Sequence, residues 1–313
     1  LYPDPDGLAL AQAIADKFDL DANRITIAPG SDSIINWLIR GWAGPGDEIV
    51  YSAHGFQSYR IRAATSGVIS VAASEQGLRA DVDALLSKVT ERTKLMFVAN
   101  PNNPTGTYLS PAEVADLRAR LRSNIMLVMD EAYFDFVRKD DYASSIQMVE
   151  EGGDNVITTR TFSKFYGLAG LRVGWAYVPA PTMAPLGRMR GPFSVTNISL
   201  AAAKAALEDD DYATASMAHN EQWVTWLNQE ISALGYRVTD SVGNFALMQI
   251  PGGTDATIAF VKILDQKGFS VRRTDQNALP DWVRITVGVE KANRAIVEAI
   301  KSFGSVFAAE GTK

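Results

Sequence analysis

The sequence predicts an α/β protein, in which a large domain with a mostly parallel seven-stranded sheet wrapped by helices precedes a smaller C-terminal α+β domain. Over the first two-thirds of the chain, short β-branched runs alternate with amphipathic helical ones. That alternation is typical of a parallel sheet covered by helices. The length of 313 residues allows two domains, or one large α/β domain with an appendage. From about Thr196 long helices dominate, which indicates a different architecture for the remainder.

Seven runs in the first part of the chain have the composition of buried strands. They are residues 25–28, 48–52, 68–72, 95–99, 125–129, 155–159 and 174–178. Amphipathic stretches between them predict helices over residues 31–42, 57–65, 82–88 and 112–121. Ser31 and Ser110 are the expected N-caps of the first and last of these helices, and Pro111 with Glu113 supports the second assignment.

The C-terminal part predicts four helices and three strands. The helices are expected over residues 198–207, 212–234, 254–267 and 290–302, and the strands over 244–250, 270–273 and 283–286. A short acidic run at 209–211 interrupts helical sequence and marks the expected domain boundary. We therefore expect an N-terminal segment over residues 1–20, a large domain over 21–208 and a small domain over 209–313.

The composition is poor in side chains that perform hydrolytic or metal chemistry. Cysteine is absent, and the only histidines are His54 and His219. Disulfides, thiolate catalysis and cysteine-based zinc sites are thus excluded, and the two histidines lack metal-ligand spacing, so no metal site is expected. His54 could line a site, but a loop position is expected for it and an exposed one for His219. This favours a binding protein or an enzyme that borrows its chemistry from a cofactor.

Several function classes lack their usual signals. A net charge of −6 gives no electrostatic case for nucleic acid, and no apolar run is long enough to span a membrane. No glycine-rich dinucleotide fingerprint follows the first strand, and neither a Walker lysine nor a G-x-S-x-G elbow occurs. Dehydrogenase, nucleotide hydrolase and α/β-hydrolase functions are therefore disfavoured.

Polar residues follow four of the expected strands, at the sheet edge where open α/β proteins bind ligands. A glycine turn into a helix N-terminus, at Gly30 to Asp32, suits an anion. An amide-rich run occupies residues 100–106, Asp130 follows the fifth strand, and Lys164 follows the sixth. Each alone has an ordinary explanation as a turn, a helix cap or a surface lysine. Their order and spacing together are much harder to obtain by accident.

The stretches that contain these residues resemble fold type I aminotransferases dependent on pyridoxal phosphate, and within that group the histidinol-phosphate aminotransferases. The resemblance covers the whole chain and is carried by Tyr2 to Pro5, Gly30 to Asp32, Asn100 to Gly106, Asp130 to Tyr133, Thr161 to Gly174 and Arg284 to Gly288. The family begins with an arm of some tens of residues that covers the site. No such arm precedes Leu1, so we expect that the chain begins at a trimmed or unseen point.

The resemblance implies a pyridoxal 5'-phosphate site. Lys164 would be the catalytic residue, binding the cofactor aldehyde and then moving the substrate proton. Asp130 would pair with the pyridine nitrogen, and Phe56 would stack on the ring. Asn103 and Tyr133 would hydrogen-bond the ring 3' oxygen. The phosphate would be bound by Ser31, Asp32, Ser163 and Arg172, with Thr161 as a weaker candidate.

The resemblance also implies substrate contacts and a partner. Arg284 would bind the substrate's anionic group, together with Asn103 and with Arg272 or Arg273, the count from Gly268 favouring Arg272. Both could equally be surface charges. Tyr2 would reach the phosphate of a partner subunit, giving a homodimer with shared active sites; the alternative is a disordered terminal residue.

The implied function is transfer of an amino group between L-histidinol phosphate and 2-oxoglutarate, giving imidazole-acetol phosphate and glutamate in histidine biosynthesis. The expected location is cytoplasmic. Alternatives on the same fold are an aromatic amino acid aminotransferase and a threonine phosphate decarboxylase. A cofactor-sensing module of a regulator is the alternative from another class, but it predicts an attached basic DNA-binding domain, and this chain shows none.

Overall fold

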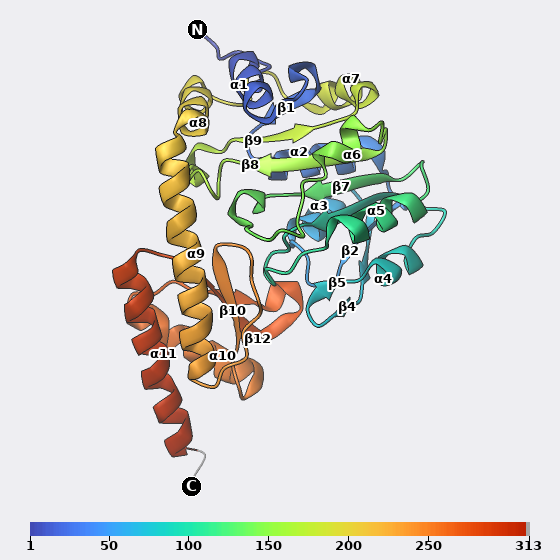
Figure 1. The fold of residues 1–313 in the computed structure, drawn as a ribbon. Helices are drawn as coiled ribbons and strands as arrows, with labels where there is room; N and C mark the ends of the chain where they lie inside the picture. Colours follow the sequence, from blue (N-terminus) through green and yellow to red (C-terminus); the bar gives the residue numbers. More distant parts are fainter. Residues whose placement is uncertain (311–313) are drawn as a thin grey trace.

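A seven-stranded sheet forms the centre of the larger part of the molecule (Figure 1). The computed structural model describes residues 1–310, with side chains as far as residue 303. The strands run in the order β1-β9-β8-β7-β6-β2-β3. Their bounds are Ile25–Ala28 (β1), Glu48–Ser52 (β2), Ile69–Ala73 (β3), Thr93–Ala99 (β6), Met126–Asp130 (β7), Val156–Thr161 (β8) and Gly174–Tyr177 (β9). The predicted mostly parallel sheet is confirmed, and only β9 runs antiparallel to its neighbours β1 and β8.

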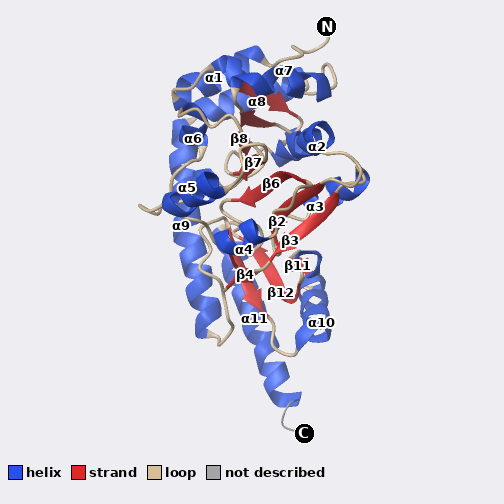
Figure 2. Cartoon of the chain, turned by 90° about the vertical axis from the view of Figure 1, so that its right-hand side faces the viewer, coloured by secondary structure: helices blue, strands red, loops and turns tan. Residues whose placement is uncertain are grey.

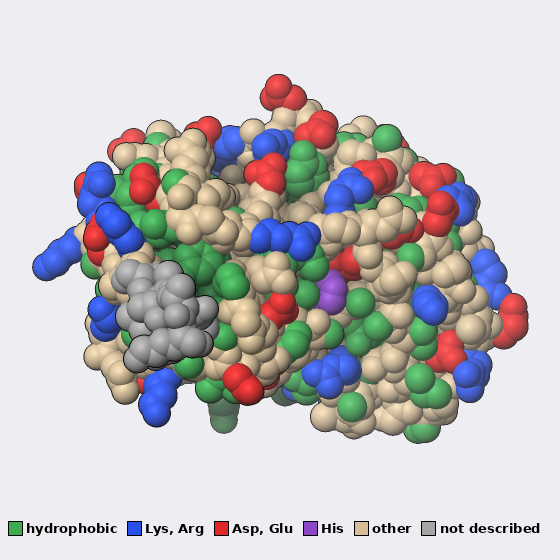
Figure 3. Space-filling view, turned by 90° about the horizontal axis from the view of Figure 1, so that it is seen from below, with side chains coloured by type: hydrophobic (Ala, Val, Ile, Leu, Met, Phe, Trp, Pro, Cys, Tyr) green, Lys and Arg blue, Asp and Glu red, His purple; other side chains and the backbone are tan. Residues whose placement is uncertain are grey.

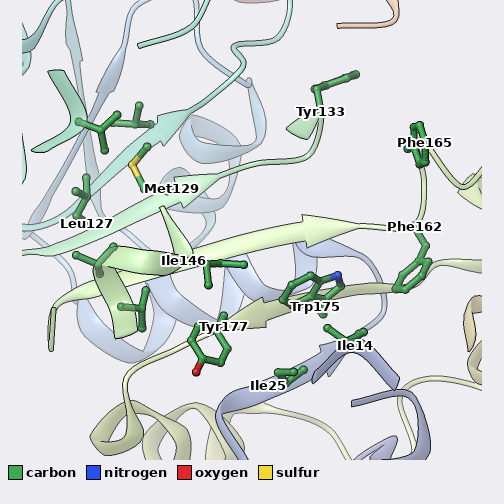
Figure 4. Packing of buried hydrophobic residues seen from close by; sticks show 14 of the residues in the cluster. Ile14, Ile25, Leu127, Met129, Tyr133, Ile146, Phe162, Phe165, Trp175 and Tyr177 are labelled. Carbon is green, nitrogen blue, oxygen red and sulfur yellow. The ribbon is translucent and has the colours of Figure 1, made fainter. Parts of the chain in front are cut away.

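Helices cover both faces of this sheet. The residues of its central strands are therefore buried on both sides. Ile34, Leu38 and Tyr59 pack on one face, from α2 (Ser31–Trp42) and α3 (Ser58–Thr65), together with α7 (Ala180–Met189). The other face is covered by α1 (Leu8–Phe18), α4 (Val82–Ser87), α5 (Pro111–Arg120), α6 (Ile146–Glu150) and α8 (Asn197–Glu208). Figure 4 shows part of this second cluster, in which Ile14 of α1 and Ile146 of α6 lie near Trp175 of β9.

The N-cap predictions have opposite outcomes. Ser110 caps α5 as expected, and Glu113 completes a capping box behind Pro111. The assignment of Ser31 as a cap is wrong, because Ser31 is already helical and Gly30 is the capping residue, with φ 82°. A Cβ atom on Gly30 would lie only 2.5 Å from Nη2 of Arg172. That guanidinium is the end of a flexible side chain, so it is the positive φ of Gly30 that favours glycine at the cap.

Three helices and a hairpin were not predicted. The first helix, α1, buries Leu10 and Ile14 within the stretch that was expected to be only an N-terminal segment. The others are α6, which is only five residues long, and α7, which contains Pro181 in its first turn and Pro185 inside it. Proline usually argues against a helix. A short hairpin pairs β4 (Glu75–Gln76) with β5 (Arg79–Ala80). These elements cover the sheet and its edge.

The C-terminal part has its own three-stranded antiparallel sheet, in the order β10-β12-β11. The strands are Phe245–Gln249 (β10), Arg272–Thr274 (β11) and Leu279–Thr286 (β12). Three helices pack around them: α9 (Asp210–Ala233), α10 (Gly253–Gln266) and α11 (Glu290–Glu310). This agrees with the predicted α+β architecture, although β12 starts four residues earlier than the expected 283.

One long helix connects the two parts. Asp209 is the only residue between α8 and α9, and its side chain accepts the N–H of Tyr212 at 2.8 Å to cap α9. Met217 in the first half of α9 packs against the core of the large sheet, whereas Leu227 and Ile231 in the second half belong to the small-sheet core. Figure 2 shows α9 running along the side of both sheets. The domain boundary at 208–209 stays a prediction, since one helix serves both cores.

The surface carries mixed charge. On the face that Figure 3 shows, Lys and Arg side chains are interspersed with Asp and Glu rather than gathered into one basic patch. None of the helices within residues 1–310 is both long enough and apolar enough to cross a membrane.

Candidate active site

An open cavity lies at the carboxyl ends of β6, β7 and β8, beside the start of α2. Except for Tyr2, every residue predicted to contact the cofactor lines it: Ser31, Asp32, Phe56, Asn103, Asp130, Tyr133, Thr161, Ser163, Lys164 and Arg172. The strands place them there because consecutive parallel strands bring their carboxyl ends to one edge of the sheet. The grouping of these side chains, expected from strand ends far apart in sequence, is thus present in the structure.

Asp130 is the buried acid of the cavity, with only 4% of its surface exposed. Oδ2 accepts a hydrogen bond from the Tyr59 hydroxyl at 2.9 Å, and Oδ1 accepts one from Thr159 at 3.3 Å. Burial raises the pKa of Asp130 above its usual value, while these hydrogen bonds and the charge of Lys164 oppose the rise. Its two side-chain partners are neutral, so the carboxylate can still pair with a cation that enters the cavity.

Lys164 lies in the loop that follows β8, with its amine 5.6 Å from the centroid of the Tyr133 ring. The loop is held by its own backbone: the N–H of Gly167 donates to Lys164 O at 3.0 Å, and Leu168 donates to Phe162 O at 3.0 Å. Phe162 is fully buried and anchors the turn in the core. The lysine is therefore presented to the cavity by a turn that is hydrogen-bonded through its own backbone and anchored in the core.

Next to this turn lies a cradle suited to a phosphate. The backbone N–H groups of Ser31 and Asp32, at the start of α2, lie outside the helical hydrogen-bond ladder and are open to an anion. The guanidinium of Arg172 donates to Ser163 Oγ at 3.4 Å and to Ala169 O at 3.0 Å. A Cβ atom on Gly174 would lie 2.3 Å from the Ser31 nitrogen, so only glycine lets β9 pass this closely. The cradle combines a helix N-terminus, a hydroxyl and a guanidinium.

The polar side chains of Asp32 and Thr161 are already engaged within the protein. Ser58 and Arg62 donate to the Asp32 carboxylate, so Asp32 offers the cradle its backbone N–H and not its charge. The Thr161 hydroxyl accepts the Ser163 N–H at 3.1 Å and donates to Val173 O at 3.4 Å. Thr161 thus supports the turn that carries Ser163.

Arg284, on β12 of the small sheet, does not line the cavity but contacts Asn103, which does. Its Nη1 donates to Oδ1 of Asn103 at 2.6 Å, while its buried Nε has no hydrogen-bond partner among the described residues. Burial lowers the pKa of Arg284 from its usual range, and the nearby Arg272 adds to that effect. A bound anion would offset both penalties.

The register of the small sheet distinguishes the two other arginines. Arg272 stands opposite Arg284 across the β11–β12 ladder, whereas Arg273 stands opposite Val283. Cross-strand partners share a face, and successive residues alternate. Arg272 therefore lies on the face of Arg284, and Arg273 lies on the other face, near Asp275 at 3.5 Å.

Sequence reasoning missed a reciprocal contact between the two sheets at the loop that carries Phe56. A ring nitrogen of His54 lies 2.8 Å from Asn277 O, and Asn277 Nδ2 donates to Gly55 O at 2.8 Å. Asn277 belongs to the short turn that joins β11 to β12. The small sheet thus fixes the backbone beside the cavity's aromatic side chain. No local sequence signal marks Asn277, because its partners are more than two hundred positions away.

Like Arg284 and Arg272, Tyr2 and His219 are not among the residues that line the cavity. Tyr2 is 80% exposed and stacks on Phe193, with ring centroids 4.7 Å apart, so it does not reach the cavity of its own chain. Its expected role lies in a partner subunit and stays a prediction. His219 is exposed as expected and contacts Gly288 O at 2.9 Å.

The residues of the cavity fit pyridoxal phosphate by the chemistry of their donor set. Lys164 offers an amine for the aldehyde, Asp130 a buried carboxylate for the ring nitrogen, and Phe56 a stacking face. The cradle at Ser31 and Arg172 depends on glycine at positions 30 and 174, since a Cβ on either would fill it.

Comparisons with known proteins agree with this geometry. A family model described as aminotransferase class I and II matches residues 1–300. The histidinol-phosphate aminotransferase of Paramagnetospirillum magneticum is 49% identical over 304 residues, which cover 96% of this chain and 83% of that protein. That of Maricaulis maris is 44% identical, covering 97% of this chain and 84% of the relative.

Among solved structures, the histidinol-phosphate aminotransferase of Sinorhizobium meliloti, in complex with pyridoxal-5'-phosphate, superposes with a TM-score of 0.92. It is 26% identical, and the match covers 98% of this chain and 84% of that one. The extent of the family match and the identity to these relatives lead to one conclusion: the chain belongs to the class I and II aminotransferases.

Proposed function

We propose that the protein is a pyridoxal-phosphate-dependent histidinol-phosphate aminotransferase, exchanging the amino group between L-histidinol phosphate and 2-oxoglutarate. The observation that carries the proposal is the convergence of Lys164, Asp130 and Arg172 on one cavity. The activity shared by the curated relatives supports the choice of amino donor.

Each cavity residue has a defined role in this proposal. Bound pyridoxal phosphate supplies an aldehyde that captures the amino group and a ring that accepts electrons from the substrate α-carbon. Lys164 Nζ removes the proton from that α-carbon. Asp130 pairs with the protonated pyridine nitrogen; at about 4 Å and an effective dielectric near 20, such a pair is worth about 4 kcal/mol. That equals roughly three pK units, enough to keep the ring nitrogen protonated.

The remaining residues position the cofactor and substrate. Phe56 stacks on the ring, while Asn103 and Tyr133 hydrogen-bond the ring oxygen. Ser31, Asp32, Thr161, Ser163 and Arg172 hold or support the phosphate. Arg284, with Arg272 on the same face of the small sheet, binds the anionic group of either substrate through a guanidinium fork. One arginine pair can serve both a phosphate monoester and a dicarboxylate because both present paired oxygens.

We further propose a homodimer in which Tyr2 completes the phosphate site of the partner. The observation in favour is that Tyr2 is exposed and turned away from its own cavity, with its ring stacked against Phe193. A tyrosine hydroxyl is a suitable donor to a phosphate oxygen.

A half-reaction screen tests the amino donor. The full chain loaded with pyridoxal phosphate is mixed separately with histidinol phosphate, phenylalanine and threonine phosphate, and the cofactor absorbance is followed. Conversion to the aminated cofactor with histidinol phosphate, and not with phenylalanine, is the expected result. Carbon dioxide release from threonine phosphate would instead identify a decarboxylase, and preferred conversion by phenylalanine an aromatic aminotransferase.

A lysine variant tests the catalytic assignment. Lys164→Ala should reduce turnover by at least about a thousandfold, since it removes both the covalent anchor and the proton-transfer group. Borohydride should fix the cofactor to the unchanged protein but not to this variant. Lys88→Ala, at an exposed lysine after α4, is the matched control and should keep full activity. A Lys164→Ala protein with normal turnover would contradict the proposal.

A further inference from the structure

Tyr59 is a buried residue of α3, and its hydroxyl contacts the carboxylate of Asp130. Only 1% of its surface is exposed, and the hydroxyl donates to Asp130 Oδ2 at 2.9 Å. Burial and the charge of Asp130 raise the pKa of Tyr59 well above its usual value. The phenol therefore stays protonated and remains a donor across the working pH range.

The aromatic packing around Tyr59 fixes the direction of this donor. The ring stacks on Phe97 with centroids 4.8 Å apart, and it meets Phe56 edge-on at 5.7 Å and Tyr51 at 6.3 Å. A ring enclosed on several sides cannot change rotamer without opening the core. The hydroxyl is thus aimed at Asp130 before any ligand arrives.

The same short helix is tied to two other parts of the cavity. Phe56 lies at the entry to α3, where the Tyr59 N–H donates to Phe56 O at 3.2 Å. Ser58 and Arg62, on α3, both donate to Asp32 at the anion cradle. One helix therefore sets the positions of the stacking ring, the acid's donor and the start of α2 relative to one another.

The hydrogen bonds to Asp130 leave part of the carboxylate available. A carboxylate offers about four lone-pair sites. Tyr59 takes one on Oδ2, while Thr159 and the Ala132 N–H take others. The remaining lone-pair sites are available to a ligand, since Asp130 lines the cavity. The titratable groups that face it are Tyr59 from α3 and Lys164 from the loop after β8.

We propose that Tyr59 is a positioning residue, whose hydroxyl holds the Asp130 carboxylate turned toward the cavity and in its charged form for the nitrogen of a cationic ring. This inference rests on the proposed cofactor site. Neutral hydroxyl donors suit the task because they stabilise the anion without competing for it as a second cation would. The hydroxyl thus opposes the rise in the pKa of Asp130 that burial produces.

The test is the pH dependence of pyridoxal phosphate affinity in the full-length chain. Removing the hydroxyl in Tyr59→Phe lets the pKa of Asp130 rise, so acidification should protonate Asp130 sooner. A hydrogen bond to a charged group is worth about one pH unit or somewhat more, so the acid midpoint of binding should move up by about one unit. At alkaline pH, where Asp130 is ionised in both proteins, the two affinities should be similar.

Two controls separate this role from a structural one. Tyr51→Phe removes a hydroxyl from a ring in contact with Tyr59 that makes no hydrogen bond to Asp130 among residues 1–303, and its midpoint should match that of the unchanged protein. In an Asp130→Asn background, Tyr59→Phe should produce no further shift. An unshifted midpoint in Tyr59→Phe alone, or a shift of equal size when Asp130→Asn is also present, would overturn the proposal.

A second measurement keeps the proposal testable if the cofactor assignment is wrong or Tyr59→Phe is unstable. If the unchanged chain binds no pyridoxal phosphate at any pH, the proposed function is refuted. The carboxyl carbon of Asp130, followed by NMR in the same full-length protein without ligand, would then still report its pKa. The pKa of Asp130 should be higher in Tyr59→Phe than in the unchanged protein. Thr159→Val should raise it less, because the hydrogen bond from Thr159 is the longer of the two. Unchanged values in both variants would overturn the role of Tyr59.

Discussion

Arg284 joins the small sheet to the cavity through its hydrogen bond to Asn103. Its Nη1 is engaged by Asn103, and its buried Nε is unpartnered among the described residues. Because a guanidinium stays charged in proteins, its burial is a penalty that the fold carries until an anion arrives. Burial lowers the pKa of Arg284, which expresses the same penalty.

Arg284→Gln should therefore weaken both halves of the reaction. We expect kcat/KM to fall by about a hundredfold or more for histidinol phosphate and for 2-oxoglutarate alike, because a buried charged contact is lost in each case. Steady-state kinetics with each substrate varied in turn measures this. Arg272→Gln should show a smaller loss.

Arg273→Gln is the matched control for these arginine variants. Arg273 lies on the opposite face of β11, so its replacement should leave kcat/KM nearly unchanged. A larger loss from Arg273→Gln than from Arg272→Gln would show that the face assignment is wrong.

Single residues differ in how far sequence could predict them. Lys164 and Asp130 lie at or just after strand ends, so the carboxyl-end rule brings them to the sheet edge. The choice between Arg272 and Arg273 depended on a strand register, which only the pairing with β12 shows. Tyr59 and Asn277 went unnoticed because their roles arise from contacts with residues far along the chain.

At the scale of elements, α5 is held by a capping box that also contains an ion pair. Glu113 accepts the Ser110 N–H at 2.8 Å and pairs with Arg79 of the β4–β5 hairpin. The hydrogen bond from Arg79 is the largest cause that lowers the pKa of Glu113, from the ordinary 4.5 to about 2. A helix start and a sheet-edge hairpin are thus joined through one carboxylate.

Glu113→Gln should reduce stability in a pH-dependent way. A carboxylate with a lowered folded-state pKa stabilises the protein fully above its unfolded value, here 4.5, and loses that contribution as pH falls through about 2. The unfolding free energies of the two proteins should therefore differ at pH 7 and converge on acidification. Urea unfolding at several pH values measures the difference. A difference that stays constant from neutral pH down to the acid limit of the folded state would contradict the pairing.

Most elements were predictable because their signals are local. The seven strands are short runs rich in apolar and β-branched residues, and the start of α5 carries its cap in the sequence itself. The cap of α2 was placed one residue too late because serine is a common capping residue, whereas the structure puts a positive φ of 82° and the cap at Gly30. The helix α7 was missed because its two prolines oppose helix formation locally, and burial of Thr182 and Leu186 overrides them.

At the scale of the whole molecule, the elements near Tyr2 expose several large apolar side chains. Leu8 on α1 and Ile198 on α8 are both more than 60% exposed, and the Tyr2–Phe193 stack is exposed as well. The two helices pack against each other in the fold. Such a surface suits the homodimer that we propose.

A mixing experiment distinguishes shared from separate active sites. Tyr2→Ala should weaken cofactor binding by roughly tenfold to a hundredfold, the value of a hydrogen bond to a charged group. Lys164→Ala should be inactive. In a dimer of one chain of each variant, one cavity lacks both Lys164 and the partner's Tyr2, and the other cavity has both. Co-refolding the two variants should therefore restore cofactor affinity and activity in up to half of the mixed-dimer sites.

The control mixes a double variant, which carries both Tyr2→Ala and Lys164→Ala, with the unchanged chain. In those mixed dimers each cavity has one defect, and no fully native site forms. Equal activity of the two kinds of mixed dimer would contradict the exchange of Tyr2 between subunits, and a monomer in sedimentation would contradict the dimer itself.

The long helix α9 limits how this protein can be rebuilt by recombination. Its first half contributes Met217 to one core and its second half contributes Leu227 to the other. A crossover at Asp209 would join the large core to a foreign helix, and a crossover inside α9 would join two half-helices with unrelated faces. The large and small sheets are therefore poor modules for exchange between relatives, and any chimaera must keep α9 together with the residues of both cores that it packs against.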